Sequence, residues 1–257
     1  MTIARHPLPA VTSGDARRDR SRVAVLPVGS FEQHGPCLPL STDTVIAQAI
    51  ADRICLDYDL FPLPPVTISC SHEHSAFPGT LSLQATTLHS VVSDIWKSLD
   101  RDGWTGLVIV NGHGGNHVLS NLAQELNADA PRVVLFPTGP DLEAAGRAAA
   151  LQAEVGRTDM HAGEFEVSLL LHVAPHLVRP GYEAADWETE EWRSGLHLRG
   201  IEPYAPQGVI GRPSAASAEK GRVILDSLSS SCGRLLAYLS GNPVGRRSRR
   251  PTDMADR

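Results

Sequence analysis

Paired cysteines are missing from this chain. Its 257 residues contain four cysteines without any regular spacing, at Cys37, Cys55, Cys70 and Cys232. Scattered cysteines do not make the disulfide framework of a small secreted domain, and no apolar segment of signal-peptide length precedes them. We therefore expect reduced thiols and a cytoplasmic location.

Long apolar runs and an excess of basic residues are missing as well. No apolar stretch approaches the roughly 20 residues that a helix needs to cross a bilayer, so we expect no membrane partner. The formal net charge of -6 argues against a nucleic-acid surface spread over the whole domain. Five arginines gather in the C-terminal "VGRRSRRPTDMADR". They indicate a disordered basic tail at 243–257, with nucleic-acid binding as the alternative.

What the chain does contain is an alternation of strand and helix patterns. Strand-like segments at 22–28, 106–112 and 132–139 are separated by helical patterns, which fall at 41–54, 86–103, 116–128, 141–155 and 217–239. Strands separated by helices predict a parallel sheet with helices on both faces. We expect an α/β fold: a flexible arm at 1–21, then a single three-layer α/β/α domain with a mainly parallel sheet at 22–242.

Polar residues cluster where the expected strands end, which is where open α/β sheets bind their ligands. "LPVGSFEQHGPCLPLSTDT" (26–44) supplies Glu32, His34 and Asp43, and "VIVNGHGGNH" (108–117) supplies His113. The structural alternatives are a polar surface loop and a tight glycine turn whose histidine only forms hydrogen bonds. Neither of the common glycine spacings of phosphate loops is present.

The segment "DMHAGEFEVSLLLHV" (159–173) begins polar and becomes amphipathic. His161 and Glu164 are three residues apart, so they would share a face at the start of a helix, whereas Glu166 would point elsewhere. The alternative for Glu164 is a first-turn carboxylate that the helix dipole stabilises.

A further cluster, "SHEHSAFPGTLSL" (71–83), places His72, Glu73 and His74 before a Phe-Pro-Gly-Thr turn. The proline and glycine indicate a shaped loop over a pocket. We expect Glu73, His74 and Phe77 to bind substrate there rather than to hold metal, and the alternative is a surface loop with incidental histidines.

Taken together, the clusters predict a metal centre. Three carboxylates and two imidazoles without a thiolate suit a catalytic site for Zn²⁺ first, with Mn²⁺ or Fe²⁺ as alternatives. These five candidate ligands are Glu32, His34, Asp43, His113 and Glu164. They exceed what one tetrahedral ion with an open position needs, but they fit two divalent ions about 3.5 Å apart, with Asp43 as the bridging carboxylate.

These motifs resemble the creatininase (creatinine amidohydrolase) family. The matching segments, in family order between about 23 and 240, are "VLPVGSFEQHGPCLPLSTDT", "EHSAFPGTLSL", "VNGHGGN", "HAGEFEVSLLL" and "GVIGRPSAASAEKG". The resemblance implies a three-layer α/β/α amidohydrolase with two metal ions, usually a homo-oligomer and often a hexamer. It also implies that His161 is the catalytic histidine. At the expected site Glu166 would orient His161 or act as an acid, and the alternative is a buried structural acid at a helix start.

One departure from the family pattern affects the expected ligand set. Creatininase has a glutamate ligand two residues after the histidine of the glycine loop, where this chain has Gly115. The resemblance then nominates Glu164 as the replacement, and it makes creatinine an unexpected substrate.

The expected activity is that of a metal-dependent hydrolase of carbon–nitrogen bonds. We expect it to cleave a non-peptide amide bond of a small cyclic amide or a formamide with a metal-activated water. The alternatives are a metallopeptidase that trims a precursor peptide, as in mycofactocin maturation, and a relative that binds metal without catalysis.

Overall fold

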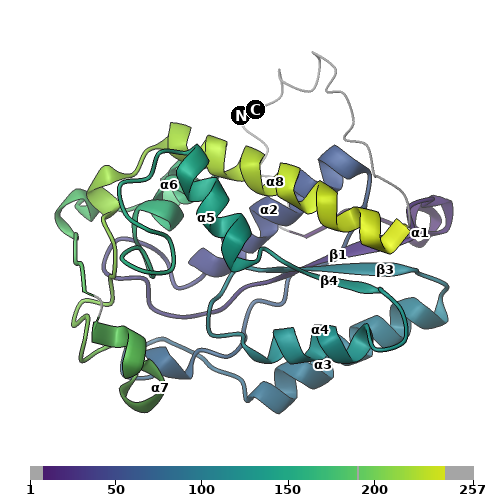
Figure 1. Cartoon of the computed structure of the whole chain (residues 1–257), viewed down its shortest axis with the longest axis horizontal. Coiled ribbons are helices and arrows are strands. Elements are labelled where there is room, and N and C mark those ends of the chain that lie inside the picture. Colours follow the sequence, from purple (N-terminus) through teal and green to yellow (C-terminus); the bar gives the residue numbers. More distant parts are fainter. Residues whose placement is uncertain (1–7, 190, 241–257) are drawn as a thin grey trace.

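The structure is a computed structural model that describes residues 8–189 and 191–240. At its centre lies a parallel sheet with the strand order β2-β1-β3-β4. In that order the strands span Phe61–Pro62, Val23–Val28, Gly106–Asn111 and Val133–Phe136. Helices cover both faces of the sheet (Figure 1), so the predicted three-layer α/β fold is confirmed.

Alternate residues of each strand enter opposite layers of the core, because successive side chains of a strand point to opposite faces. Val25 and Val108 pack with one set of helices, which are α2 (Thr42–Tyr58), α5 (Gly139–Ala148), α6 (Glu164–Val173) and α8 (Ala218–Ser240). Leu26 and Ile109 pack on the other face with α3 (Ala85–Arg101) and α4 (Val118–Leu126). Both faces of the sheet are therefore buried, as an apolar parallel sheet requires.

Helix α5 is shorter than the sequence pattern predicts. It ends at Ala148 instead of continuing to residue 155, and Ala150 adopts a left-handed conformation with φ 51°. The chain beyond it turns back, so that the N–H groups of Gln152 and Ala153 donate to the carboxylate of Glu164. Tertiary hydrogen bonds thus end a helix that local propensity would have continued.

Part of the expected N-terminal arm is ordered against the domain. Helix α1 (Ser13–Arg18) begins with a capping box between Thr12 and Asp15, and Ala16 packs against the core layer beneath α3 and α4. Residues 1–7 of the arm and the expected basic tail at 243–257 lie outside the described residues.

The connections carry several short helices. One of them is α7 (Leu196–Arg199), and single 3₁₀ turns fall at His72–His74, Pro175–Leu177, Tyr182–Ala184, Glu191–Ser194 and Pro213–Ala215. None of the helices within 8–189 and 191–240 has the length and hydropathy of a bilayer-crossing segment.

Candidate metal centre

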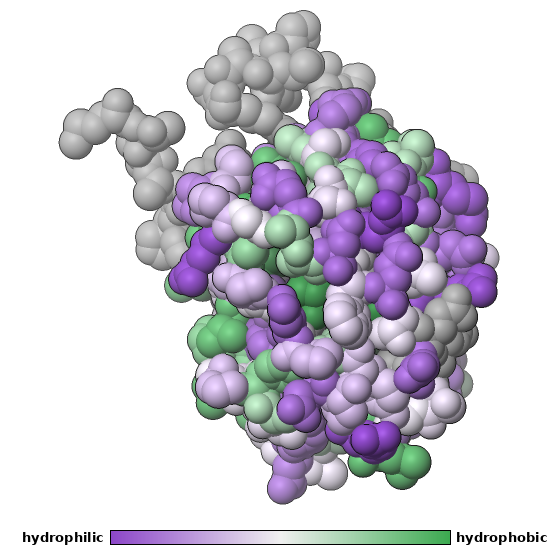
Figure 2. Space-filling view, turned by 90° about the vertical axis from the view of Figure 1, so that its left-hand side faces the viewer, coloured by the Kyte–Doolittle hydropathy of each residue, from purple (hydrophilic) through white to green (hydrophobic). Residues whose placement is uncertain are grey.

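The polar clusters meet at one end of the sheet. Strands β1 and β3 run in register until Val28 pairs with Asn111, so the loops that follow them start side by side. The 3₁₀ turn His72–His74 joins them there and is tied to the segment after α7, because Ile201 donates its N–H to the carbonyl of Glu73. Figure 2 looks onto this end of the molecule, whose surface is mostly hydrophilic.

The loop after β1 runs inward rather than over the surface. Glu32 is 0% exposed and His34 is 1% exposed, so the polar surface loop is excluded for both. Asp43 lies in the first turn of α2, where the helix dipole favours a carboxylate. The loop after β3 packs directly on this turn, since a Cβ at Gly112 would lie 2.5 Å from the carbonyl oxygen of Asp43.

A first group of donors consists of Glu32, Asp43 and His113. Nδ1 of His113 lies 3.1 Å from Oε1 of Glu32 and 3.1 Å from Oδ2 of Asp43. Nε2 of the same ring donates to the carbonyl of Cys70 at 2.8 Å, so a neutral His113 turns the lone pair of Nδ1 toward the two carboxylates. Three lone-pair donors that converge in this way can hold a cation.

A second group consists of His34, Asp43 and Glu166. Nδ1 of His34 donates to the carbonyl of Glu32 at 3.1 Å, which leaves the lone pair of Nε2 facing the group. That Nε2 lies 2.9 Å from Oδ1 of Asp43 and 3.8 Å from Oε2 of Glu166. Asp43 therefore offers one oxygen to each group, which is the geometry expected of a bridging carboxylate.

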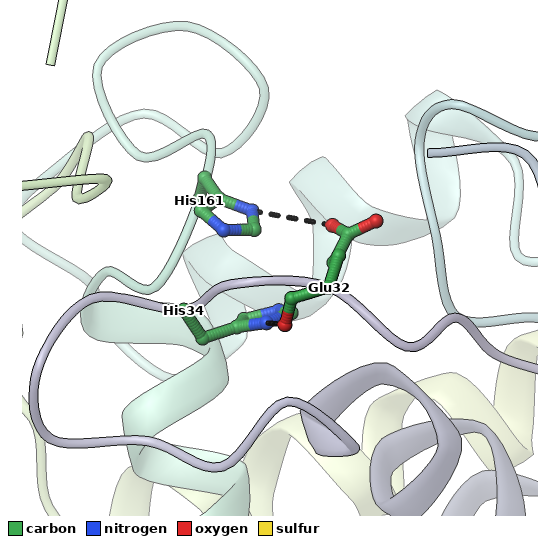
Figure 3. Close-up of side chains that lie close together, drawn as sticks. All are labelled: Glu32, His34 and His161. Carbon is green, nitrogen blue, oxygen red and sulfur yellow. Dashed lines mark hydrogen bonds and ion pairs between the residues drawn. The ribbon is translucent and has the colours of Figure 1, made fainter. Parts of the chain in front are cut away.

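Glu32 provides the test of whether this geometry fits a cation. Neither of its carboxylate oxygens has a hydrogen-bond partner, although the side chain is fully buried. Imidazole nitrogens of His74, His113 and His161 stand at 3.2, 3.1 and 3.8 Å from Oε1 instead; Figure 3 shows the last of these approaches. A buried carboxylate without hydrogen bonds is costly unless a positive charge compensates it, so the residues present fit a metal ion.

Electrostatic coupling between the two groups is strong. Burial acts to lower the pKa of His34, but Asp43, Glu166 and Glu32 raise it to about 10. Burial acts to raise the pKa of Asp43, but His34 and His113 lower it well below the usual value. Burial raises the pKa of Glu166 to about 8, with His34 opposing. The centre thus holds the ionised carboxylate of Asp43 beside the ring of His34, whose protonated form the nearby carboxylates stabilise.

His161 lies against the centre without belonging to a helix. Its Nε2 donates to the carbonyl of Gln33 at 2.7 Å, so Nδ1 carries the lone pair and faces Glu32. Burial, followed by the nearby His34 and His74 rings, lowers the pKa of His161 well below its usual value. A neutral imidazole with a lone pair directed into the site can accept a proton there.

The expectation that His161 and Glu164 share a helix face is wrong. Helix α6 begins at Glu164, while Ala162 has a left-handed φ of 53° and His161 pairs with Ile210 in an isolated bridge. Glu164 points away from the centre and forms an ion pair with Lys220. Its carboxylate already has a positive partner, and the structure does not bring it together with the other four expected ligands.

Glu166, rather than Glu164, faces the donors His34 and Asp43. Its Oε2 accepts a hydrogen bond from the N–H of Ala162 at 2.6 Å and faces His34. The two glutamates are two residues apart on α6, so they are rotated roughly 200° from each other and only one can face the centre. The sequence suggests Glu166 only as a partner of His161 and not as a ligand, and nothing in the sequence shows that Ala162 adopts a left-handed conformation just before α6 begins.

The three expected substrate-binding residues occupy different positions. His74 is buried within the centre, and Oε1 of Glu73 lies 3.3 Å from Nε2 of His113. Phe77 instead packs against the small apolar cluster of Ile201, Ala205 and Ile210, where it supports the loop. Glu73 and His74 therefore line the centre, whereas Phe77 belongs to the apolar packing of the loop.

Gly115 explains how the chain departs from the creatininase ligand pattern. A Cβ at this position would lie 2.0 Å from Oε1 of Glu73 and 2.4 Å from Nε2 of His113. The carboxylate of Glu73 thus fills the space where a side chain at position 115 would begin. The His113 ring and the backbone carbonyl of Cys70, at 2.8 Å, block the same position, so a glutamate ligand is sterically excluded here.

Comparison with known proteins identifies the family. The family model Creatininase, described as creatinine amidohydrolase, matches residues 10–236. The chain belongs to the creatininase family. The resemblance expected from the motifs is therefore confirmed over nearly the whole domain.

Several relatives within the family have names. The mycofactocin precursor peptide peptidase of Mycolicibacterium smegmatis is 34% identical over 221 residues, covering 82% of each chain. The creatinine amidohydrolase of Pseudomonas putida is 28% identical over 227 residues, covering 79% of this chain and 84% of the relative. Among solved structures, a manganese form of creatininase ("Creatininase Mn") superimposes with a TM-score of 0.72 at 24% identity, covering 89% of this chain and 96% of the other.

Proposed function

We propose that this chain is a metal-dependent hydrolase that cuts a peptide bond of a mycofactocin-type precursor peptide. Four relatives named as mycofactocin precursor peptide peptidases are 33–34% identical to it, against 28% for the creatinine amidohydrolase. This makes the peptidase, at first the alternative, the preferred function. Homo-oligomerisation and a cytoplasmic location, both expected from the sequence, remain part of the proposal.

The observation that carries the proposed chemistry is the pair of donor groups that share Asp43. Glu32, Asp43 and His113 would hold one ion, and His34, Asp43 and Glu166 would hold the other. The oxygen and nitrogen donors suit Zn²⁺, Mn²⁺ or Fe²⁺. Each histidine is oriented by a backbone carbonyl on its other nitrogen, as metal-binding histidines commonly are.

Bound divalent ions would supply the Lewis acid that polarises the amide carbonyl and lowers the pKa of a water toward 7. The chain itself supplies the proton transfer. Nδ1 of His161 takes the proton that the attacking water loses and delivers it to the leaving nitrogen, because the lone pair faces the centre and the ring is neutral. Glu166 is now proposed as a ligand rather than as the orienting partner of His161.

A small cyclic amide or a formamide is the second candidate substrate, which the creatinine amidohydrolase relative supports. Creatinine itself is disfavoured, since Glu73 occupies the space that the creatininase-type ligand at position 115 would need. A peptide bond and a small amide place the same demands on the metal centre, so only substrate trials separate them.

The test uses purified protein loaded in turn with Zn²⁺, Mn²⁺ and Fe²⁺. It is incubated with the precursor peptide of a mycofactocin-producing organism, both unmodified and as the matured substrate, and with creatinine and formamides. We expect mass spectrometry to show the peptide split into two products with the addition of one water, and His161→Ala to abolish the split. Hydrolysis of a small amide with the peptides intact would favour the second candidate, and an inert protein with every metal would overturn both.

A further inference from the structure

Four imidazole rings crowd around Glu32 and Asp43, and they do not present the same atom to the centre. His34, His113 and His161 each donate one ring N–H to a backbone carbonyl, at 3.1, 2.8 and 2.7 Å. Their remaining nitrogens carry lone pairs directed into the centre. His74 has no such anchor among its described contacts; its Nδ1 lies 2.9 Å from Nε2 of the Gln33 side chain.

The orientation of the Gln33 amide follows from two contacts that do not involve histidine. The N–H of Gly35 lies 2.9 Å from Oε1 of Gln33 and can only donate, so that atom must be the oxygen. The carbonyl of Gly208 lies 3.1 Å from Nε2 and can only accept, so that atom must be the nitrogen. With both ends fixed, the NH₂ group of Gln33 has one hydrogen for Gly208 and one for His74.

This orientation determines the state of His74. Because Gln33 donates, Nδ1 of His74 must accept and cannot carry a proton. A neutral ring then has its proton on Nε2, which faces the centre 3.2 Å from Oε1 of Glu32. A doubly protonated ring would set an N–H against the Gln33 N–H, so the same contact opposes it.

We propose that Gln33 is a positioning residue that assigns opposite roles to two histidines. Its side chain holds His74 as an N–H donor toward the centre, and its backbone carbonyl holds His161 as a lone-pair acceptor. His74 therefore cannot serve as a metal ligand. Its N–H points into the centre, where the carbonyl oxygen of a bound amide can accept it. The inference deepens the proposed function, since it assigns the donor for the same reaction.

The surroundings of Gln33 are shaped for this orientation. Gly208 has a φ of +79°, and a Cβ there would lie 1.7 Å from Oε1 of Gln33. Gln33 itself is 5% exposed, so its amide cannot exchange these partners for solvent. A fixed, buried amide is what a tautomer-setting residue requires, because a mobile amide could present either end to the ring.

The main test is nuclear magnetic resonance of the zinc-loaded protein labelled with ¹⁵N-histidine, in which long-range couplings report which ring nitrogen carries hydrogen. His74 is assigned from the signal lost in His74→Gln. We expect the Nε2–H form for His74 in the native chain. Gln33→Glu should convert His74 to a ring protonated on Nδ1, because a carboxylate accepts where the amide donated. His161 is the internal control, since its anchor is the backbone of residue 33 and its tautomer should not change.

A native His74 protonated on Nδ1, or a His74 that remains in the Nε2–H form in Gln33→Glu, would overturn the proposal. These outcomes do not depend on any substrate. Failure of peptide hydrolysis with the tautomers as expected would count against the proposed function alone. If the protein takes up no zinc, the same spectra recorded on the protein as purified decide the question.

A second pair of variants leaves Gln33 in the chain. Gly208→Ala pushes a methyl group into the amide oxygen, so we expect the Nε2–H preference of His74 to be lost and kcat to fall about 10- to 100-fold, as for other residues that orient a site. Gly156→Ala is the matched control, because its φ is +76° but a Cβ there meets nothing within 4 Å. Equal effects of the two substitutions on the tautomer would show that backbone strain, not the Gln33 amide, is responsible.

Discussion

The loop after β1 and the segment that opens α6 each contain a fully buried glutamate, but the two differ in how the carboxylate charge is neutralised. Glu32, in the first, is fully buried and has no hydrogen-bond partner. Glu164, in the second, is equally buried but has Lys220 and two backbone N–H groups as partners. A buried carboxylate indicates a metal ion only when the protein itself leaves its charge uncompensated.

Loss of Asp43, the residue that both groups share, should weaken metal binding most. Asp43→Ala should empty the centre, because each group loses a carboxylate oxygen and retains only two protein donors. Metal affinity and kcat/KM should both fall by more than the 10- to 100-fold typical of residues that only orient ligands. Elemental analysis after dialysis and peptide hydrolysis are the measurements.

The matched control for Asp43 is Asp141→Ala. Asp141 is also a first-turn aspartate, at the start of α5, but it caps its own helix through Thr138. The substitution Asp141→Ala should lower the free energy of unfolding by about 1 kcal/mol, because a helix cap is lost, and it should leave the metal content unchanged. Full occupancy in Asp43→Ala alongside an empty centre in Glu32→Ala would show that Asp43 does not bridge.

The next test compares the two glutamates of α6. Glu166→Gln should lose about half of the bound metal and most of the activity, because His34 and Asp43 alone remain for the second ion. Glu164→Gln should keep the metal but lower the free energy of unfolding by about 1–3 kcal/mol, since its partners are Lys220 and backbone groups. Metal content and urea unfolding of the two variants separate these effects; a reversed pattern would restore Glu164 as the ligand.

The sequence was sufficient for those features that periodicity and strand order determine. The alternation of segments predicted the parallel sheet, and Glu32, His34, Asp43 and His113 follow strands whose carboxyl ends meet at one edge. Glu164 could not be placed in this way. Its orientation depends on the left-handed turn at Ala162 and on Lys220, which lies 56 residues further along the chain. Neither is visible in a local pattern.

The role of Gln33 is a second feature that local sequence patterns could not predict. Lying between two candidate ligands, it has no chemistry of its own that would mark it, and its partners Gly208 and His74 are distant in sequence. Local patterns show which residue types could take part in a site. The hydrogen bonds that choose a tautomer arise only when distant loops pack together.

The pH dependence of metal affinity provides a further test that needs no substitution. His34 has a pKa raised to about 10, and Glu166 has a pKa raised to about 8. Burial acts to lower the pKa of His113, but Glu32 and Asp43 raise it well above its usual value. All three groups must give up protons before they bind a cation. Affinity for Mn²⁺ should therefore rise with pH, and uptake should release protons. From a pKa of about 8 we expect Glu166 to be largely ionised at pH 9 but not at pH 7, so that it contributes about one proton fewer to the release at pH 9. Calorimetry in buffers of different ionisation enthalpy measures this; equal release at both values would remove Glu166 from the ligands.

The smallest expected effect concerns Glu73, which contacts His113 from outside the donor groups. Glu73→Gln should weaken metal binding about 10-fold, because the carboxylate helps to orient the ring whose Nδ1 faces Glu32 and Asp43. Gly115→Ala should cost more, since its Cβ would lie 2.0 Å from Oε1 of Glu73. If that collision is the cause, part of the loss should disappear when Gly115→Ala is combined with Glu73→Ala, and a double-mutant cycle on metal affinity will show the coupling. Simple additivity of the two substitutions would mean that Glu73 does not hold the space beside His113, and that the His113 ring and the Cys70 carbonyl alone exclude a side chain at position 115.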